Sequence, residues 1–502
     1  MTISQQTKKE YGDFQTPWEL SHKICKLLYN KGIKPRSIIE PTCGQGNLLM
    51  AAMEWFDSVE VGLGYDINDR YIQQVKTKLC DQPYAGKIKV VNANFFALDW
   101  KSITAQLPEP ILFIGNPPWA TNSFLGGLES GNLPAKKNSD QYCGLDALTG
   151  KSNFDISEWM WRYLLDSLGK KLGWVALLTK TVVARKIIQY SYKHQLPIMQ
   201  SSLYIVDAKK YFHAAVSAGL LVCHLGQEKS NYSCSVYENI ENPVKQSTFG
   251  IHEGHLIADL ANFNQWQHLQ GRTVYQWRSG IKHDCAKIME MTGNFADLKN
   301  GFGEPVSLEN NYLYPLLKSS DIAHQKSSSR YLLVTQSKVG AETKSIAIHA
   351  PLTWLYLSQH QAFFDRRKSS IYKGKPPFSI FGVGDYSFAP WKVAISGLYK
   401  KLAFCLISPH EGKPVMLDDT CYFLACQSQS EAILLEHLLN SKVAQEFLSA
   451  FIFWDAKRPI TASLLNRLDL FKLADELGKG EELREYHDFC DGSPIIKGMM
   501  QR

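Results

Sequence analysis

The chain has 502 residues, of which 45% are hydrophobic, and its 55 Lys and Arg against 48 Asp and Glu give a net charge of +7. This length is too great for one ordinary core and predicts two or three domains, while the mild positive charge permits a nucleic-acid partner without requiring one. With no apolar run of membrane-spanning length and no secretory signal at Met1, we expect a cytoplasmic protein without a membrane partner. The 11 cysteines lack paired C-x-x-C spacing and indicate neither a disulfide framework nor a metal site.

The first part of the chain alternates helix and strand signals. Thr16 is a candidate N-cap and Pro17 a candidate first helical residue, because apolar residues follow them at helical spacing. Residues 37–39 are predicted to form a short buried strand, and a helix is predicted to resume at residues 48–52. The loop at residues 40–47 joins this strand to this helix.

Three further strands are predicted at residues 61–65, 88–91 and 111–114. The first of them ends at Asp66, the second runs into Asn94 and Phe95, and the third runs into Asn116. Strands that alternate with helices predict an α/β fold with a doubly wound parallel sheet. Ligands bind at the carboxyl ends of such strands, where all of these polar landmarks fall.

The glycine loop at Gly44 and Gly46 favours close approach of a ligand to the backbone, since glycine has no Cβ. Leu49 stands where a dinucleotide fingerprint would have its third glycine, and the Lys of a phosphate-binding P-loop is missing. Acidic residues at Glu40 and Asp66 suit a cationic cofactor with a ribose. A purely structural turn is the alternative.

Asn116-Pro117-Pro118-Trp119 is a stiff loop with few donors, because neither proline has a backbone N–H. The Asn116 side-chain oxygen and the Pro117 carbonyl can accept from one amino group, and the Trp119 ring offers a flat face to a heterocycle. The alternative is a turn in which these residues serve only local geometry.

These motifs, in this order, resemble the S-adenosylmethionine-dependent amino-methyltransferases of DNA. Residues 14–17, Phe-Gln-Thr-Pro, are similar to the motif that precedes the cofactor loop in the gamma-class N6-adenine enzymes, in which a long target recognition domain follows the catalytic motif. The resemblance covers essentially the whole chain. It implies a type II restriction-modification-like adenine methyltransferase, prokaryotic or phage-encoded. Asn-Pro-Pro-aromatic loops also occur in enzymes that methylate protein glutamine and structured RNA.

The resemblance also implies roles for individual residues. Asn116, Pro117, Pro118 and Trp119 would be catalytic. The chain has Asn94 where the family usually has Asp, so this contact with the cofactor adenine would be weaker. The residues expected to bind the cofactor are Thr16, Glu40, Pro41, Gly44, Gly46, Asp66, Ile67, Asn94 and Phe95.

The resemblance implies that an aromatic residue further along the chain forms the second wall of a base pocket. Residues 211–220 resemble the family motif whose aromatic ring packs on the extruded base, and we assign this role to Phe212, with Tyr211 as the alternative and a core position for either ring as a third possibility. The polar insertion at residues 124–153 is expected to be either a mobile loop that closes over substrate or touches phosphate, or a disordered surface insertion.

Beyond residue 228 the composition turns polar, which predicts a Rossmann-like methyltransferase domain at residues 1–228 and a mixed α+β target recognition domain at residues 229–502. Double-stranded DNA is the expected partner. The candidate DNA contacts are Lys180, Lys318, Arg366, Arg367, Lys368 and Lys392, with Arg458 less favoured.

Methylation without cleavage is expected, because no convincing nuclease motif is found, and a restriction endonuclease would be encoded separately. A monomer is favoured. The alternatives are an RNA or protein-glutamine methyltransferase, a DNA cytosine-N4 methyltransferase, and a protein that recognises DNA without modifying it.

Overall fold

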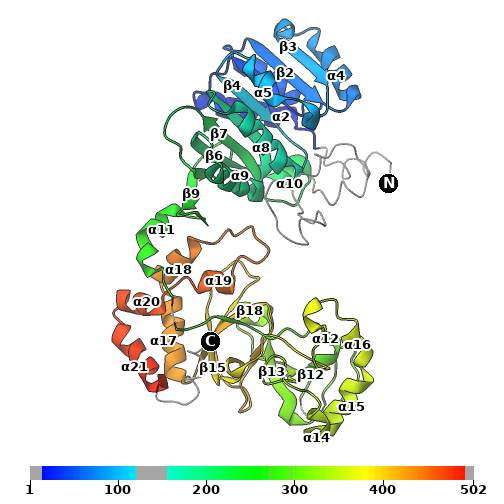
Figure 1. Ribbon diagram of the computed structural model, residues 1–502, viewed down its shortest axis with the longest axis vertical. Helices are drawn as coiled ribbons and strands as arrows, with labels where there is room; N and C mark the ends of the chain where they lie inside the picture. The colour runs from blue at the N-terminus through cyan, green and yellow to red at the C-terminus, as the bar shows by residue number, and fades with distance from the viewer. Residues whose placement is uncertain (1–13, 120–154, 273, 295–296, 492–502) are drawn as a thin grey trace. The chain divides into compact units, whose positions relative to one another are not determined.

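The computed structural model describes residues 14–119, 155–272, 274–294 and 297–491. The chain divides into two units between Leu260 and Ala261 (Figure 1).

The centre of unit 1 is a parallel sheet with the order β3-β2-β1-β4-β5. Every residue of β1 and β4 is buried, as expected for parallel strands that are covered on both faces. The carboxyl ends of these strands therefore share one edge, which confirms the predicted doubly wound arrangement. The strands are β1 Ser37–Glu40, β2 Val61–Asp66, β3 Ile88–Asn92, β4 Ile111–Gly115 and β5 Gly173–Lys180.

Five later strands widen this sheet to ten. β7 lies antiparallel between β5 and β6, and β8 pairs in parallel with the outer edge of β6. The predicted domain boundary after residue 228 precedes β8, whereas the structure places β8 to β10 in unit 1, because they pair in succession with its sheet. The bounds are β6 Ile198–Val206, β7 Ala218–Leu225, β8 Ser233–Tyr237, β9 Lys245–His252 and β10 His255–Ile257.

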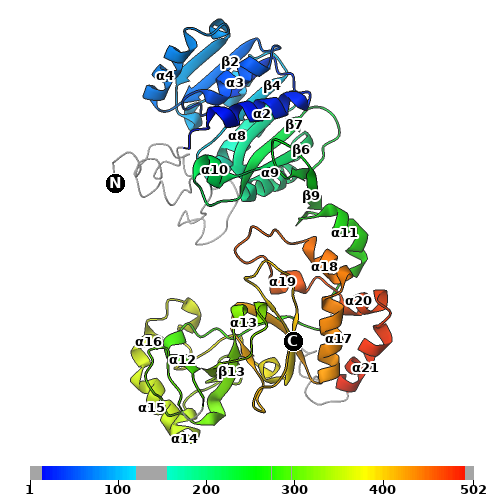
Figure 2. The same cartoon turned by 180° about the vertical axis from the view of Figure 1, so that it is seen from behind.

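Helices cover both faces of the sheet. α2, α3, α4 and α10 share a buried apolar cluster with one face (Figure 2), and α5, α8 and α9 cover the other (Figure 1). α2 begins one residue later than predicted, with Pro17 rather than Thr16 as its N-cap. The helices are α2 Trp18–Asn30, α3 Asn47–Trp55, α4 Asp69–Leu79, α5 Trp100–Ala105, α8 Ile156–Leu168, α9 Thr181–Lys193 and α10 Ala208–Phe212.

Unit 2 contains two four-stranded sheets, with the orders β11-β18-β15-β16 and β12-β14-β13-β17. Their strands are β11 Arg278–Ser279, β12 Glu290–Thr292, β13 Leu313–Leu317, β14 Arg330–Leu333, β15 Trp391–Ser396, β16 Cys405–Ile407, β17 Met416–Leu417 and β18 Cys421–Cys426. Most neighbouring strands are antiparallel, as the predicted mixed α+β class requires.

Helices form a separate apolar cluster against each sheet of unit 2. None of the helices in the described ranges is both long enough and apolar enough to cross a membrane. The helices are α11 Leu260–Trp266, α12 Ala286–Met289, α13 Ser319–Ala323, α14 Ile346–His349, α15 Pro351–Gln359, α16 Gln361–Asp365, α17 Gln429–Leu439, α18 Lys442–Ser449, α19 Ala462–Leu465, α20 Leu470–Glu476 and α21 Gly480–Asp491.

Candidate active site and cofactor site

The loop after β1 is fixed by a buried carboxyl group. Glu40 Oε2 accepts a hydrogen bond of 2.9 Å from the Leu49 N–H in the first turn of α3. Burial raises the pKa of Glu40 well above its usual range, and the nearby Asp66 carboxylate adds to this rise. A cationic ligand group next to Glu40 would favour its charged form. The side chain is therefore suited to a ligand that carries positive charge.

The glycines of this loop are required by the backbone. Gly44 and Gly46 have φ angles of +47° and +76°, which side chains with a Cβ rarely adopt. A Cβ on Gly44 would lie 2.2 Å from Gln15 Oε1, which itself accepts a 2.9 Å hydrogen bond from the Gln45 N–H. Thr16 contributes its carbonyl, which accepts from Asn47 Nδ2 at 2.9 Å. The segment before α2 thus lies on the glycine loop.

Asp66 at the end of β2 joins two loops. Its Oδ2 accepts from the Gly44 N–H and its Oδ1 from the Asn68 N–H, both at 2.8 Å. A carboxylate has about four lone-pair sites, and its oxygens are suitable acceptors for ribose hydroxyls. The next residue, Ile67, is apolar but 50% exposed. An apolar side chain uncovered at this edge provides a surface for a flat ring.

The segment after β3 is held by hydrogen bonds among its own residues. Asn94 Oδ1 accepts from the Phe96 N–H at 2.9 Å and so caps a short 3-10 helix. Phe95 is buried, with its ring centroid 4.9 Å from that of Trp100, whose Nε1 donates to the Phe95 carbonyl at 3.0 Å. The Asn94 amide oxygen is thus used to hold the turn that carries Phe95.

Asn116 is oriented by Phe14, a residue of the 14–17 motif for which the sequence predicted no individual role. Its Nδ2 donates to the Phe14 carbonyl at 2.7 Å, which leaves the amide oxygen as the group to accept from a ligand. Trp119 Nε1 donates to the Leu178 carbonyl at 3.4 Å, so the far end of the loop is also tied to the sheet. The partners of Asn116 and Trp119 lie 102 and 59 residues away in sequence, and no local pattern could have identified them.

The aromatic side chains next to this loop pack on one another. The Trp119 and Phe212 centroids are 5.1 Å apart at an interplanar angle of 70°, and the Phe14 ring contacts both. Tyr211, the alternative to Phe212, instead has its hydroxyl 3.3 Å from Lys23 Nζ. Phe212 is therefore the ring that faces Trp119. This edge contact leaves no room for a base between the two rings.

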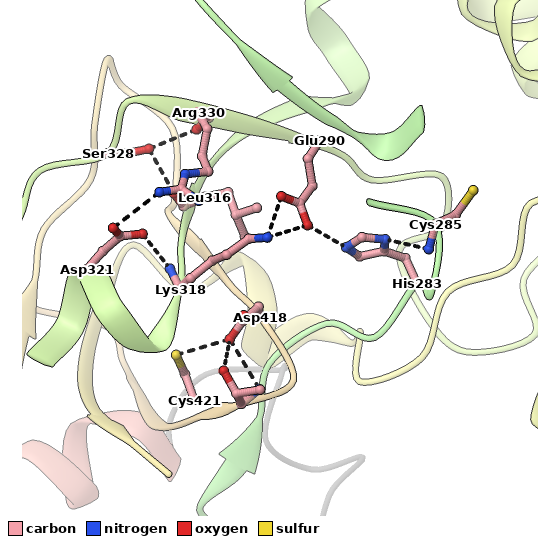
Figure 3. Close-up of polar contacts among 11 residues, drawn as sticks. His283, Cys285, Glu290, Leu316, Lys318, Asp321, Ser328, Arg330, Asp418 and Cys421 are labelled. Atoms are coloured by element: carbon pink, nitrogen blue, oxygen red, sulfur yellow. Dashed lines mark hydrogen bonds and ion pairs between the residues drawn. The ribbon is translucent and has the colours of Figure 1, made fainter. Parts of the chain in front are cut away.

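Several candidate DNA contacts are occupied within the protein. Lys180 Nζ lies 3.0 Å from the Trp119 carbonyl and 2.7 Å from Asp155 Oδ2. Lys318 Nζ lies 2.6 Å from Glu290 Oε1, and Glu290 also faces His283 (Figure 3). These ammonium groups stabilise their own units, so neither is free for phosphate in this structure.

Two further candidates are also held inside unit 2. Arg367 donates to the His283 and Ser379 carbonyls at 3.3 and 2.7 Å. Lys392 is only 1% exposed and donates to the Ala389 carbonyl at 2.7 Å, so it cannot reach a phosphate from this position. The sequence could not reveal this, because residues on both faces of β15 are buried and no alternation marks an exposed position for Lys392.

Other candidates remain at the surface. Arg366, Lys368 and Arg458 are exposed. The insertion at residues 124–153 lies outside the described residues.

No protein family model matches the sequence. The chain is 46% identical over 476 residues to the type II methyltransferase M.NspV of Nostoc sp. (strain ATCC 29411 / PCC 7524), covering 94% of this chain and 98% of that protein. The chain belongs to the type II methyltransferases. This methyltransferase is thus a DNA methyltransferase of the restriction-modification type, and S-adenosylmethionine is its cofactor.

One solved structure supports the fold of this methyltransferase. The type IIL restriction-modification enzyme MmeI, solved with DNA, matches with a TM-score of 0.50 at 15% identity over 93% of this chain and 66% of that one. A Listeria monocytogenes protein described as a class I S-adenosylmethionine-dependent methyltransferase matches with a TM-score of 0.32 at 15% identity, over 45% of this chain and 66% of that one.

The residues at the sheet edge fit this cofactor. Gly44 and Gly46 allow its close approach, Asp66 offers acceptors to a ribose, and Ile67 offers an apolar surface. The buried Thr42 hydroxyl in the same loop has no hydrogen-bond partner among the described residues, so a polar ligand group could satisfy it.

Proposed function

We propose that this type II methyltransferase transfers a methyl group from S-adenosylmethionine to the N6 atom of an adenine in double-stranded DNA. The observation that carries the proposal is the orientation of Asn116. Its amide nitrogen is committed to the Phe14 carbonyl, so its oxygen is the group available to an incoming amine. An oriented acceptor next to a donor-free Pro-Pro loop suits an exocyclic amino group.

The loop would act by holding and orienting this amine. Bound S-adenosylmethionine supplies a methyl group activated by its sulfonium. The Asn116 oxygen and the Pro117 carbonyl would each accept one amine hydrogen, which favours a pyramidal nitrogen with its lone pair directed toward the cofactor site. Pro117 and Pro118 offer no competing N–H donor. No strong base is needed before the attack, because the proton can leave afterwards.

The target base would leave the duplex to reach this loop. Flipping a base costs a few kcal/mol, and stacking on aromatic rings offsets part of this cost. Trp119 and Phe212 would supply the rings. Since these rings now touch each other and Phe14, we expect them to separate when the base enters.

The two units would divide the task. Unit 1 would carry out the transfer, and unit 2 would recognise the target sequence, with exposed Arg366 and Lys368 as phosphate contacts.

A separately encoded restriction endonuclease would act on the same sequence. The methyltransferase would act in the cytoplasm as a monomer.

Premethylated DNA tests the proposed substrate atom. DNA synthesised with N6-methyladenine in place of adenine is expected to accept no labelled methyl groups, whereas matched DNA with N4-methylcytosine in place of cytosine is expected to accept them wherever the recognition site tolerates this base. The opposite pattern would replace adenine with cytosine as the target.

The Asn116→Ala variant is the matched negative control. It is expected to lose methyl transfer on unmodified DNA while still binding S-adenosylmethionine, because Asn116 lies on the substrate side of the loop. Substantial turnover by this variant would contradict the proposed role of the Asn116 oxygen.

A further inference from the structure

The Lys180 ammonium lies between two groups that are far apart in sequence. It donates to the Trp119 carbonyl at 3.0 Å and pairs with Asp155 Oδ2 at 2.7 Å. The Lys180 side chain is only 22% exposed and that of Asp155 only 9%. An ammonium group has three N–H donors, so these two contacts use most of its capacity.

Both residues of this salt bridge are joined to regular secondary structure. Asp155 Oδ1 accepts from the Ser157 N–H at 3.1 Å and from the Ser157 hydroxyl at 2.6 Å, which caps α8. Lys180 is the last residue of β5, and β5 pairs with β4, the strand that leads into Asn116. The ammonium is therefore held by a helix terminus on one side and by the sheet on the other.

The position of the loop at residues 116–119 depends on hydrogen bonds at its two ends. Pro117 and Pro118 have no N–H with which to bind the rest of the protein, so the position of the Pro117 carbonyl is set by the two ends of the loop. The Asn116 end is held through the Phe14 carbonyl. The Trp119 end is held by its indole N–H on Leu178 and by its own carbonyl on Lys180.

We infer that Lys180 is a positioning residue of the methyl-transfer step, which holds the catalytic loop through the Trp119 carbonyl and does not contact DNA. This inference rests on the proposed function, because it assumes that the Asn116 to Trp119 loop orients the target amine. The salt bridge with Asp155 keeps the ammonium in place. A small displacement of such a loop can reduce the rate about 100-fold.

The test compares Lys180→Met with the wild type in the full-length protein. At saturating DNA and cofactor, kcat is expected to fall about 10- to 100-fold, while the Kd values for DNA and S-adenosylmethionine stay within about twofold. Lys180→Arg, which keeps donors for both oxygens, should retain more of kcat. Lys193→Met, an exposed lysine at the end of α9, is the matched control and should behave as wild type.

The salt dependence of DNA binding separates positioning from phosphate contact. Lys180→Met should leave the slope of log K against log salt unchanged, because no phosphate contact is lost. A slope reduced by about one with an unchanged kcat would overturn the inference and restore Lys180 as a DNA contact.

A second variant covers the case in which Lys180→Met fails to fold. Asp155→Asn keeps an oxygen to cap α8 but removes the charge that holds the ammonium, so it should lower kcat without changing DNA affinity. An unchanged kcat in this variant would contradict the inference. If the wild type methylates a substrate other than DNA adenine, the proposed function fails, whereas the effect of Lys180 can still be measured with that substrate.

Discussion

Lysine side chains in this protein take on different roles because their surroundings differ. Lys180 and Lys318 form salt bridges with acidic side chains. Lys392 in β15 is buried, whereas Lys368 is exposed. An ammonium group that already has a carboxylate partner would have to give up that partner to bind a phosphate. The exposed side chain is therefore the stronger candidate for a phosphate contact.

Buried Lys392 predicts a specific pH dependence. Burial lowers its pKa from 10.5 to about 7 in the folded protein. Between these values the unfolded chain binds more protons, so this lysine makes the free energy of unfolding increase as the pH rises from about 7 to about 10. Lys392→Met should stabilise unit 2 by about 1–3 kcal/mol at pH 7, and this gain should shrink as the pH rises. Urea unfolding of the wild type and of Lys392→Met at several pH values measures this difference in the free energy of unfolding. A difference that does not change with pH would contradict the lowered pKa of Lys392.

Exposed Ile67 predicts an effect on cofactor affinity alone. Because its side chain is 50% exposed, Ile67→Ala should change the melting temperature little. Removing apolar surface that the cofactor would cover should raise the Kd for S-adenosylmethionine about fivefold. Isothermal titration calorimetry measures this, with Leu352→Ala, an equally exposed residue of unit 2, as the control. Equal affinities in wild type and Ile67→Ala would place the cofactor elsewhere.

The sequence identified the residues that project from strand ends and the motif at residues 14–17, but it did not predict the contacts between them. Glu40, Asp66 and Asn116 follow apolar runs, so their shared edge could be predicted from strand order. Phe14 and Gln15 act on residues 102 and 30 positions away. Such contacts are set by packing of distant segments, and no local pattern encodes them.

At the scale of elements, β8 to β10 show how a boundary can be misplaced. β8 has one buried residue, Cys234, and its other residues are partly exposed, so it lacks the continuous apolar run of β4. Its assignment depends on pairing with β6 over residues 201–204. A partly polar strand resembles a linker in composition, which is why the predicted boundary precedes it.

This pairing predicts the extent of a stable catalytic unit. A fragment of residues 1–260 should fold with a cooperative thermal transition and bind S-adenosylmethionine. A fragment of residues 1–228 leaves the outer edge of β6 unpaired, so it should aggregate or melt at a lower temperature. Calorimetry compares the melting temperatures of the two fragments, and size-exclusion chromatography compares their aggregation. Equal stability would mean that β8 to β10 do not belong to the folding unit.

At the scale of the whole molecule, the two units differ in how far sequence patterns describe them. The central parallel strands of unit 1, such as β1 and β4, are apolar runs next to a helix, so periodicity locates both. The sheets of unit 2 join strands far apart in the chain, such as β11 with β18, and short segments of two or three residues. Their class could be predicted, but their pairing could not.

Salt dependence tests the role of unit 2 in DNA binding. Arg366→Met and Lys368→Met should each reduce the slope of log K against log salt by about 0.9, with similar loss of affinity for all DNA sequences. Lys392→Met is the control and should leave the slope unchanged, because its ammonium is buried. Affinity that does not respond to salt would contradict the assignment of unit 2 as a DNA-binding unit.

The central claim is methylation of adenine N6 in double-stranded DNA. The direct measurement incubates the full-length protein with labelled S-adenosylmethionine and a mixture of DNA, RNA and protein, and then digests the DNA to nucleosides for chromatography. The label is expected in N6-methyldeoxyadenosine within one sequence context. Label in N4-methyldeoxycytidine, in RNA or in protein would contradict the claim.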